Sequence, residues 1–180
     1  MSKVTKEQIQ QWKDKHGDVY LIEIGEKAAY FREPDVKVWR FAYKALDTST
    51  TAFSLALVKN SFLGGDEELI SDEMFEDTAG QFQGLIDYEK AEYVRDGSHY
   101  VVTVGEKSCK LKPCTMQARQ LADRDNPNNI PFKSEESLVS RLWIDGDEEL
   151  KTTKHMRYFM PLMAVVKELR EKHTASLKKL

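Results

Sequence analysis

The sequence lacks the features that identify disulfide-rich, membrane-spanning or exported proteins. Only two of its 180 residues are cysteines, Cys109 and Cys114, which is too few for a disulfide framework, so we expect a reducing compartment. No apolar run approaches the roughly 20 residues that cross a bilayer. The N-terminus, Met-Ser-Lys-Val-Thr-Lys-Glu, has no apolar core of the kind found in signal peptides. The sequence therefore predicts a protein without disulfides and without membrane contact.

A strong excess of one charge is also absent, but the charge is unevenly distributed. Residues 1–94 carry 11 Lys/Arg and 18 Asp/Glu, a net charge of −7, whereas residues 95–180 carry 16 and 12, a net charge of +4. Opposite charges could draw the halves together or link copies head to tail into a homo-oligomer; neutral drift of solvated surfaces is the alternative. The positive residues of the second half are dispersed among acids, which argues against nucleic-acid binding.

One stretch of the sequence occurs twice. Residues 62–69 read Phe-Leu-Gly-Gly-Asp-Glu-Glu-Leu, and residues 143–150 read Trp-Ile-Asp-Gly-Asp-Glu-Glu-Leu, so five consecutive residues are identical. Other matches lie upstream in the same order, including Gly-Glu-Lys at 25–27 and at 105–107. Several blocks in one order at near-constant spacing indicate a tandem duplication.

The duplication predicts two related domains, at 1–94 and at 95–180. The first has an additional N-terminal helix within 5–16, where Thr5 and Gln8 have the spacing of a capping box. Hydrophobic content of 41% and charged content of 32% are typical of folded domains rather than of disordered chains.

Each half reads as a β-hairpin followed by three helices. Two β-rich runs flank a Gly-Glu pair, the signal for a tight hairpin with a type II′ turn. The runs are 19–24 and 27–32 in the first half, and 99–104 and 107–112 in the second. The predicted class is α+β, a tandem duplication of a β-hairpin plus three-helix module.

The helices are expected to begin at recognisable residues. Pro34 and Pro113 each suit the first turn of the first helix. The last helix of each half follows the acidic stretch. Its expected N-caps are Ser71 or Asp72 in the first half, and Thr152 or Thr153 in the second. The run 89–96 is expected to link the two repeats.

The repeated acids invite a metal-site interpretation that their spacing does not support. They are Asp66, Glu67 and Glu68, and their equivalents Asp147, Glu148 and Glu149. A calcium loop needs ligands at alternating positions, and acid–base catalysis needs carboxylates held apart in a cleft. Two interpretations stay open: acids that favour the N-terminus of the following helix through its dipole, or an acidic surface that binds a partner.

No other residues form a chemical site. Two cysteines cannot supply the four ligands of a zinc site, and Cys109 aligns with Ala29, which indicates a small buried residue. Trp12 and Trp39 have no counterpart in the other half, so they are candidates for partner contacts as well as for plain packing. The sequence therefore predicts no catalytic residue, no metal and no cofactor.

A basic-x-Pro motif, Arg32-Glu33-Pro34, ends the first hairpin and precedes the helices, the acidic glycine turn and the long helix. This layout resembles that of small assembly proteins of tailed bacteriophages, and most nearly the tail assembly chaperones. The resemblance covers residues 17–93, and Lys112-Pro113 repeats it more faintly. It implies a non-enzymatic protein that binds other virion or assembly proteins in the host cytoplasm, or that becomes part of the particle.

Two other classes of function stay open. The acidic face could belong to an intracellular adaptor or inhibitor that binds a host protein. The third hypothesis is a small hydrolase or metal-dependent enzyme, for which a metal ion that binds the folded state would have to raise the melting temperature.

Overall fold

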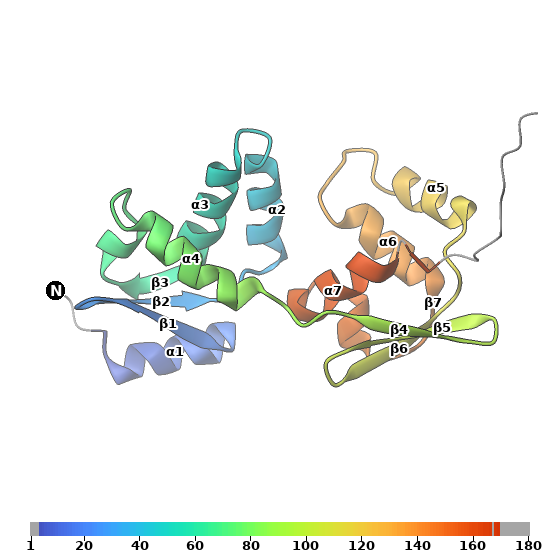
Figure 1. Cartoon of the computed structure of the whole chain (residues 1–180), viewed down its shortest axis with the longest axis horizontal. Coiled ribbons are helices and arrows are strands. Elements are labelled where there is room, and N and C mark those ends of the chain that lie inside the picture. The colour runs from blue at the N-terminus through green and yellow to red at the C-terminus, as the bar shows by residue number, and fades with distance from the viewer. Residues whose placement is uncertain (1–3, 167, 170–180) are drawn as a thin grey trace, which may run out of the picture. The chain divides into compact units, whose positions relative to one another are not determined.

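The computed structural model divides the chain into two compact units, Met1–Tyr88 and Glu89–Leu180 (Figure 1). The structure describes residues 4–166, 168 and 169. The expected domain division at 94/95 falls inside the first strand of the second unit, Glu92–Asp96.

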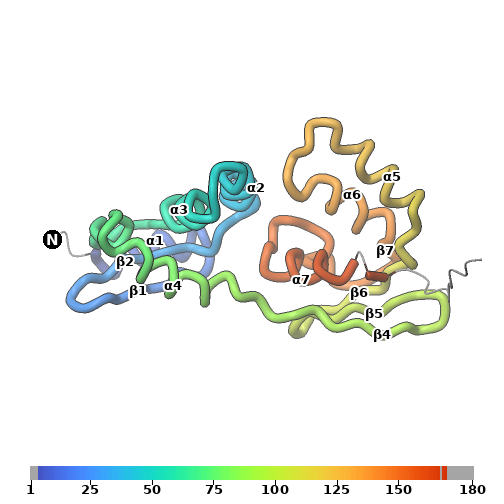
Figure 2. Tube along the Cα trace, turned by 45° about the horizontal axis from the view of Figure 1, so that its top comes forward, coloured from blue at the N-terminus to red at the C-terminus, as the bar shows by residue number. Residues whose placement is uncertain are grey.

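The first unit packs helices against a three-stranded antiparallel sheet with the order β1-β2-β3. Its elements are α1 Lys6–His16, β1 Val19–Ile24, β2 Lys27–Arg32, α2 Val36–Ala45, α3 Thr50–Ser61, β3 Phe62–Gly65, the 3-10 turn η1 Glu67–Ile70 and α4 Phe75–Ile86. Helix α1 lies on one face of the sheet, and α3 and α4 lie on the other (Figure 1). Helices α2 and α3 pack side by side (Figure 2).

The second unit has the same order of elements after an additional strand. Its elements are β4 Glu92–Asp96, β5 His99–Val104, β6 Lys107–Leu111, α5 Met116–Arg124, α6 Lys133–Leu142, β7 Trp143–Gly146, the 3-10 turn η2 Glu148–Lys151 and α7 Met156–Val166. The four strands form one antiparallel sheet in the order β4-β5-β6-β7.

The predicted α+β class is confirmed. The described residues contain seven α-helices and two antiparallel sheets, of three and four strands. Among these helices, none has the length and apolar character that crossing a bilayer requires.

The turns and the first helix form for the reasons that the sequence indicates. Thr5 and Gln8 make both hydrogen bonds of a capping box, and Gly17 ends α1 with a φ of +80°. Gly25 and Gly105 have φ values of +62° and +57° at the first position of each hairpin turn. A type II′ turn requires positive φ at that position, which glycine adopts without strain.

Three strands lie where the sequence predicted none. Strands β3 and β7 extend each expected hairpin to a third strand, and β4 occupies the run 89–96 that was expected to be a linker. The linker prediction is therefore wrong, because residues 92–96 pair antiparallel with β5. Residues Phe62–Gly65 escape recognition because they include two glycines, which are depleted in strands.

The helix starts also differ from the expected ones. Pro34 precedes the N-cap of α2 rather than standing in its first turn, and the Asp35 side chain caps the helix by accepting from the Lys37 and Val38 N–H groups. Helix α4 begins after Met74, which makes no side-chain cap. Ser71 and Asp72 are therefore not its N-caps, since the turn at 72–74 leads into the helix. In the same way α7 begins at Met156, beyond the caps expected at 152 and 153.

Each unit has its own core between the sheet and the helices. In the first unit the buried Phe31 ring packs edge-on against Phe62 and Phe82, with ring centroids 5.8 and 5.7 Å apart. In the second unit the fully buried side chains include Leu111 and Phe159. Each sheet therefore stabilises its unit through one face that is closed by helices.

Candidate functional site

The repeated acidic stretch bonds back to the hairpin in both units. The Asp66 carboxylate accepts a hydrogen bond from the Ala28 N–H at 2.9 Å, and the Asp66 N–H donates to the Ala28 carbonyl oxygen at 2.9 Å. In the second unit the Asp147 carboxylate accepts from the Ser108 N–H at 2.8 Å, and the Asp147 N–H donates to the Ser108 carbonyl at 2.9 Å. We call each pair of residues a strand clasp, because it holds the end of the third strand on the second.

A glycine lets each strand clasp close. Gly65 and Gly146 directly precede the two aspartates and have φ values of +114° and +135°. A Cβ atom on Gly65 would lie 2.4 Å from the Ala28 carbonyl oxygen, and one on Gly146 would lie 2.4 Å from the Cys109 Cα. The backbones therefore approach more closely than any other residue permits.

An ion pair accompanies each strand clasp. Lys27 pairs with Glu68, and the equivalent Lys107 Nζ lies 3.1 Å from Glu149 Oε1. Hydrogen bonds from its own backbone N–H and from Lys107 lower the pKa of the Glu149 carboxyl, and the same contact raises the pKa of Lys107. Sequence reasoning missed both lysines as partners of the acids, although they end the repeated Gly-Glu-Lys triplet.

The acids thus act on the sheet and not on the helix that follows. The interpretation that they favour the N-terminus of a long helix is wrong, because η1 and a turn separate Asp66 from the start of α4 at Phe75. Among the six acids predicted to bind a partner, the exposed ones are Glu67, Glu68 and Glu148, and the half-buried ones are Asp66, Asp147 and Glu149. The surface left for a partner is therefore smaller than the sequence implied.

Replacing Asp66 with alanine should destabilise the first unit by about 1–3 kcal/mol, because the Ala28 N–H loses its acceptor. Hydrogen exchange measured by mass spectrometry checks this result through faster exchange in 19–32. Glu67→Ala is the matched control, since this neighbouring side chain is exposed and changes stability by no more than about 0.5 kcal/mol. Equal effects of the two substitutions would contradict the structural role of Asp66.

The two unrepeated tryptophans lie in different environments. Trp39 is 4% exposed and packs among Tyr43, Phe53 and Tyr88, with ring centroids 6.1 to 6.4 Å away. The structure thus places Trp39 in the core, and of the two alternatives, a partner contact and plain packing, its burial favours packing. Trp12 is half-buried on the outer face of the sheet, 5.6 Å from the Tyr30 ring. It holds α1 against the sheet.

The two cysteines are free and buried, and the burial of Cys109 agrees with its alignment with Ala29. Burial and the nearby Asp147 carboxylate raise the pKa of the Cys109 thiol to about 12. The thiolate is the nucleophilic form of cysteine, so Cys109 has little reactivity in the folded protein.

We expect the folded protein to react slowly with a thiol reagent such as dithionitrobenzoate at pH 8, because this pH lies far below the pKa of Cys109. Denaturant should accelerate the reaction strongly by exposing both thiols. Absorbance at the wavelength of the released thiolate measures the rate. A fast reaction of Cys109 in native buffer, with Cys114→Ala as background, would contradict its burial.

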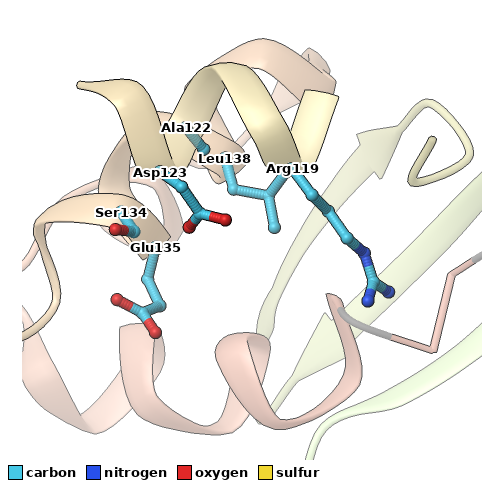
Figure 3. Close-up of a pocket in the computed structure, with 6 residues that line it drawn as sticks. All are labelled: Arg119, Ala122, Asp123, Ser134, Glu135 and Leu138. Atoms are coloured by element: carbon cyan, nitrogen blue, oxygen red, sulfur yellow. The ribbon is translucent and has the colours of Figure 1, made fainter. Parts of the chain in front are cut away.

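Two cavities, one in each unit, lie at different places in the fold. One of about 250 Å³ lies between α5 and α6, and one of about 470 Å³ lies beside α3 and α4. The first is lined by Arg119, Ala122, Asp123, Ser134, Glu135 and Leu138 (Figure 3). Figure 3 shows the Arg119 side chain directed away from Asp123 and Glu135, so no group of charged side chains converges on one point. Within the described ranges, no three His, Cys, Asp or Glu residues are placed to hold a metal ion.

Comparison with protein-family models, with curated proteins and with solved structures found no match to this chain. The candidate site consists of the two strand clasps with their ion pairs, and of the sheet edges beside them.

Proposed function

We propose that this chain is a non-enzymatic structural or assembly protein of a bacteriophage, which acts through protein–protein contacts. The observation that carries the proposal is that the carboxylates of the repeated acidic stretch make structural contacts within each unit. Asp66 and Asp147 hold strands together, and Glu68 and Glu149 pair with lysines, so these four carboxylates are engaged in structural contacts. The assignment to a bacteriophage comes from the resemblance of residues 17–93 to tail assembly proteins.

We further propose that the two units descend from one ancestral module. Both have the order hairpin, two helices, third strand, 3-10 turn and helix. Both carry a strand clasp at the same place, and both pair a lysine at the start of the hairpin's second strand with the same glutamate of the acidic stretch. A shared fold alone could arise by convergence, but a shared set of side-chain contacts supports common descent.

Purification of particles and of assembly intermediates from the native source tests the function. We expect the chain either in stoichiometric amounts in the particle or bound to one virion protein in the lysate. Recovery with a host enzyme, together with absence from particles and intermediates, would overturn the proposal and favour the adaptor or inhibitor. The acidic character of the first unit is the observation that favours the adaptor or inhibitor as a second candidate function.

A further inference from the structure

The segments that precede the two hairpins differ in secondary structure and in the part of the sheet that they cover. In the first unit this segment is α1, which ends at Gly17 and lies across one face of the sheet. In the second unit it is β4, which turns at Gly97 and pairs along the edge of β5. The edge of β5 is therefore covered, whereas among the residues that the structure describes no strand lies beside the equivalent edge of β1.

The strand clasp shows which backbone groups of β1 face outward. Ala28 directs its N–H and carbonyl groups to Asp66, away from β1. Its partner across the hairpin is Glu23, so the backbone groups of Glu23 point to the open edge. Alternation along the strand gives Leu21 and Val19 the same direction. No hydrogen bond joins the outward groups of these three residues to any residue that the structure describes.

In the second unit the equivalent outward-facing residues of β5 are paired with a strand. Ser108 bonds to Asp147, so its partner Thr103 points outward, as do Val101 and His99. Strand β4 pairs with these three residues through Glu92, Val94 and Asp96. A five-residue antiparallel strand is thus what this edge accommodates in the related unit.

The outer face of the second sheet could instead bind a helix, as the first sheet binds α1. The side chains on that face do not support this alternative. In the first unit Trp12 rests on Tyr30 and against Gly64, where a Cβ would come within 2.9 Å of its ring. The positions equivalent in register to Tyr30 and Gly64 are Lys110 and Asp145, which are exposed and charged. That face is therefore suited to water and not to a second copy of α1.

We propose that the β1 edge binds an extended, basic segment of a partner protein as a fourth antiparallel strand. Strand β1 lacks three devices that protect edges, since it contains no lysine, proline or bulge, and it exposes 48% of Leu21. Residues 1–88 carry 10 Lys/Arg and 16 Asp/Glu, a net charge of −6, and Glu23 is exposed on β1 itself. This charge favours a basic strand and opposes pairing of two acidic copies edge to edge.

A partner strand bound at the β1 edge is a protein–protein contact of the kind that the proposed function requires. The β1 site therefore rests on the proposed assembly function. It does not rest on the assignment of that function to a bacteriophage. Binding of a peptide to the purified chain and recovery from particles are independent measurements. Failure of the peptide would remove the β1 site and leave the assembly role standing. Failure of the particle experiment would remove the assembly role and leave the peptide result unchanged.

The probe is a synthetic peptide of residues 90–97 with Glu92→Lys and Asp96→Lys, added to the full-length isotope-labelled chain. We expect the amide signals of Val19, Leu21 and Glu23 to shift and to exchange more slowly with solvent. N-methylation at the Val94 position, whose N–H faces the neighbouring strand, should weaken binding about tenfold or more. N-methylation at the Arg95 position, whose N–H faces away, is the matched control and should leave binding within about twofold.

Substitution of Leu21 in the protein provides a second test of peptide binding. Leu21→Pro removes an outward N–H without breaking a bond of the hairpin, so peptide binding should be lost, whereas Leu21→Ala should retain it. If Leu21→Pro fails to fold, the pair of N-methylated peptides decides the result. Three outcomes would overturn the proposal: no shift at millimolar peptide, equal binding of both N-methylated peptides, or concentration-dependent protection of β1 without peptide, which would show that a second copy covers the edge.

Discussion

A large loss of stability is expected from Gly65→Ala, on the order of 3 kcal/mol in the first unit. Two costs combine in this substitution. A non-glycine residue at a φ of +114° is strained, and the added Cβ would lie 2.4 Å from the Ala28 carbonyl oxygen and 2.8 Å from the Ala29 Cα. Both contacts are with backbone, so no side-chain rotation relieves them. Strand β3 must therefore move off β2 and open the strand clasp.

Gly80→Ala is the matched control for Gly65→Ala. Gly80 lies within α4 and no atom lies within 4 Å of its added Cβ, so alanine should stabilise the unit by about 0.5–1 kcal/mol. Urea denaturation followed by hydrogen exchange in each unit separates the two effects. Gly65→Ala of wild-type stability would mean that the close approach of β3 and β2 is not part of the native fold.

Leu69→Ala should cost about 2–5 kcal/mol, the second large effect. Leu69 is fully buried, and its N–H donates to the Asp66 carbonyl oxygen at 3.1 Å. It therefore connects the strand clasp to the core, and its equivalent, Leu150, is buried to the same extent. Truncation leaves a cavity beneath η1, which the short turn has few ways to fill.

Leu46→Ala is the same chemical change at a position that is 42% exposed, and it should alter stability by no more than about 0.5 kcal/mol. The midpoints of urea denaturation of the two variants measure the difference. Similar midpoints would contradict the role of Leu69 as an anchor. A loss that spreads to exchange in residues 89–166 would show that the two units do not unfold independently.

The repeat predicted much of the fold because its matches fall on residues with strong local preferences. Gly25 and Gly105 set the hairpin turns, and the Thr5–Gln8 spacing sets the start of α1. Strand β4 escaped recognition because its sequence, Glu-Tyr-Val-Arg-Asp, is highly charged and gains its structure from pairing with β5. Its partner β5 begins only three residues later, at His99, so the charged composition of β4, and not a long separation along the chain, hid the strand.

The acidic stretch shows why the site was harder to predict than the fold. The sequence indicated that Asp66, Glu67 and Glu68 belong together, but their roles depend on what lies opposite them across the sheet. Asp66 lies beside the Ala28 backbone, Glu68 lies beside Lys27, and Glu67 faces water. Likewise Trp12 and Trp39 look alike in sequence, although only the second is enclosed by aromatic rings. Long-range partners decided each case.

Strand β4 determines where the chain can be cut. A fragment that starts at residue 95 would keep only the last two residues of β4 and would leave the backbone groups of Val101 and Thr103 without their partners. Exposed strand edges of this kind recruit other chains, so such a fragment is expected to aggregate during expression. A fragment that starts at Glu89 keeps the whole strand and is the better choice for crystallisation or for domain-by-domain calorimetry.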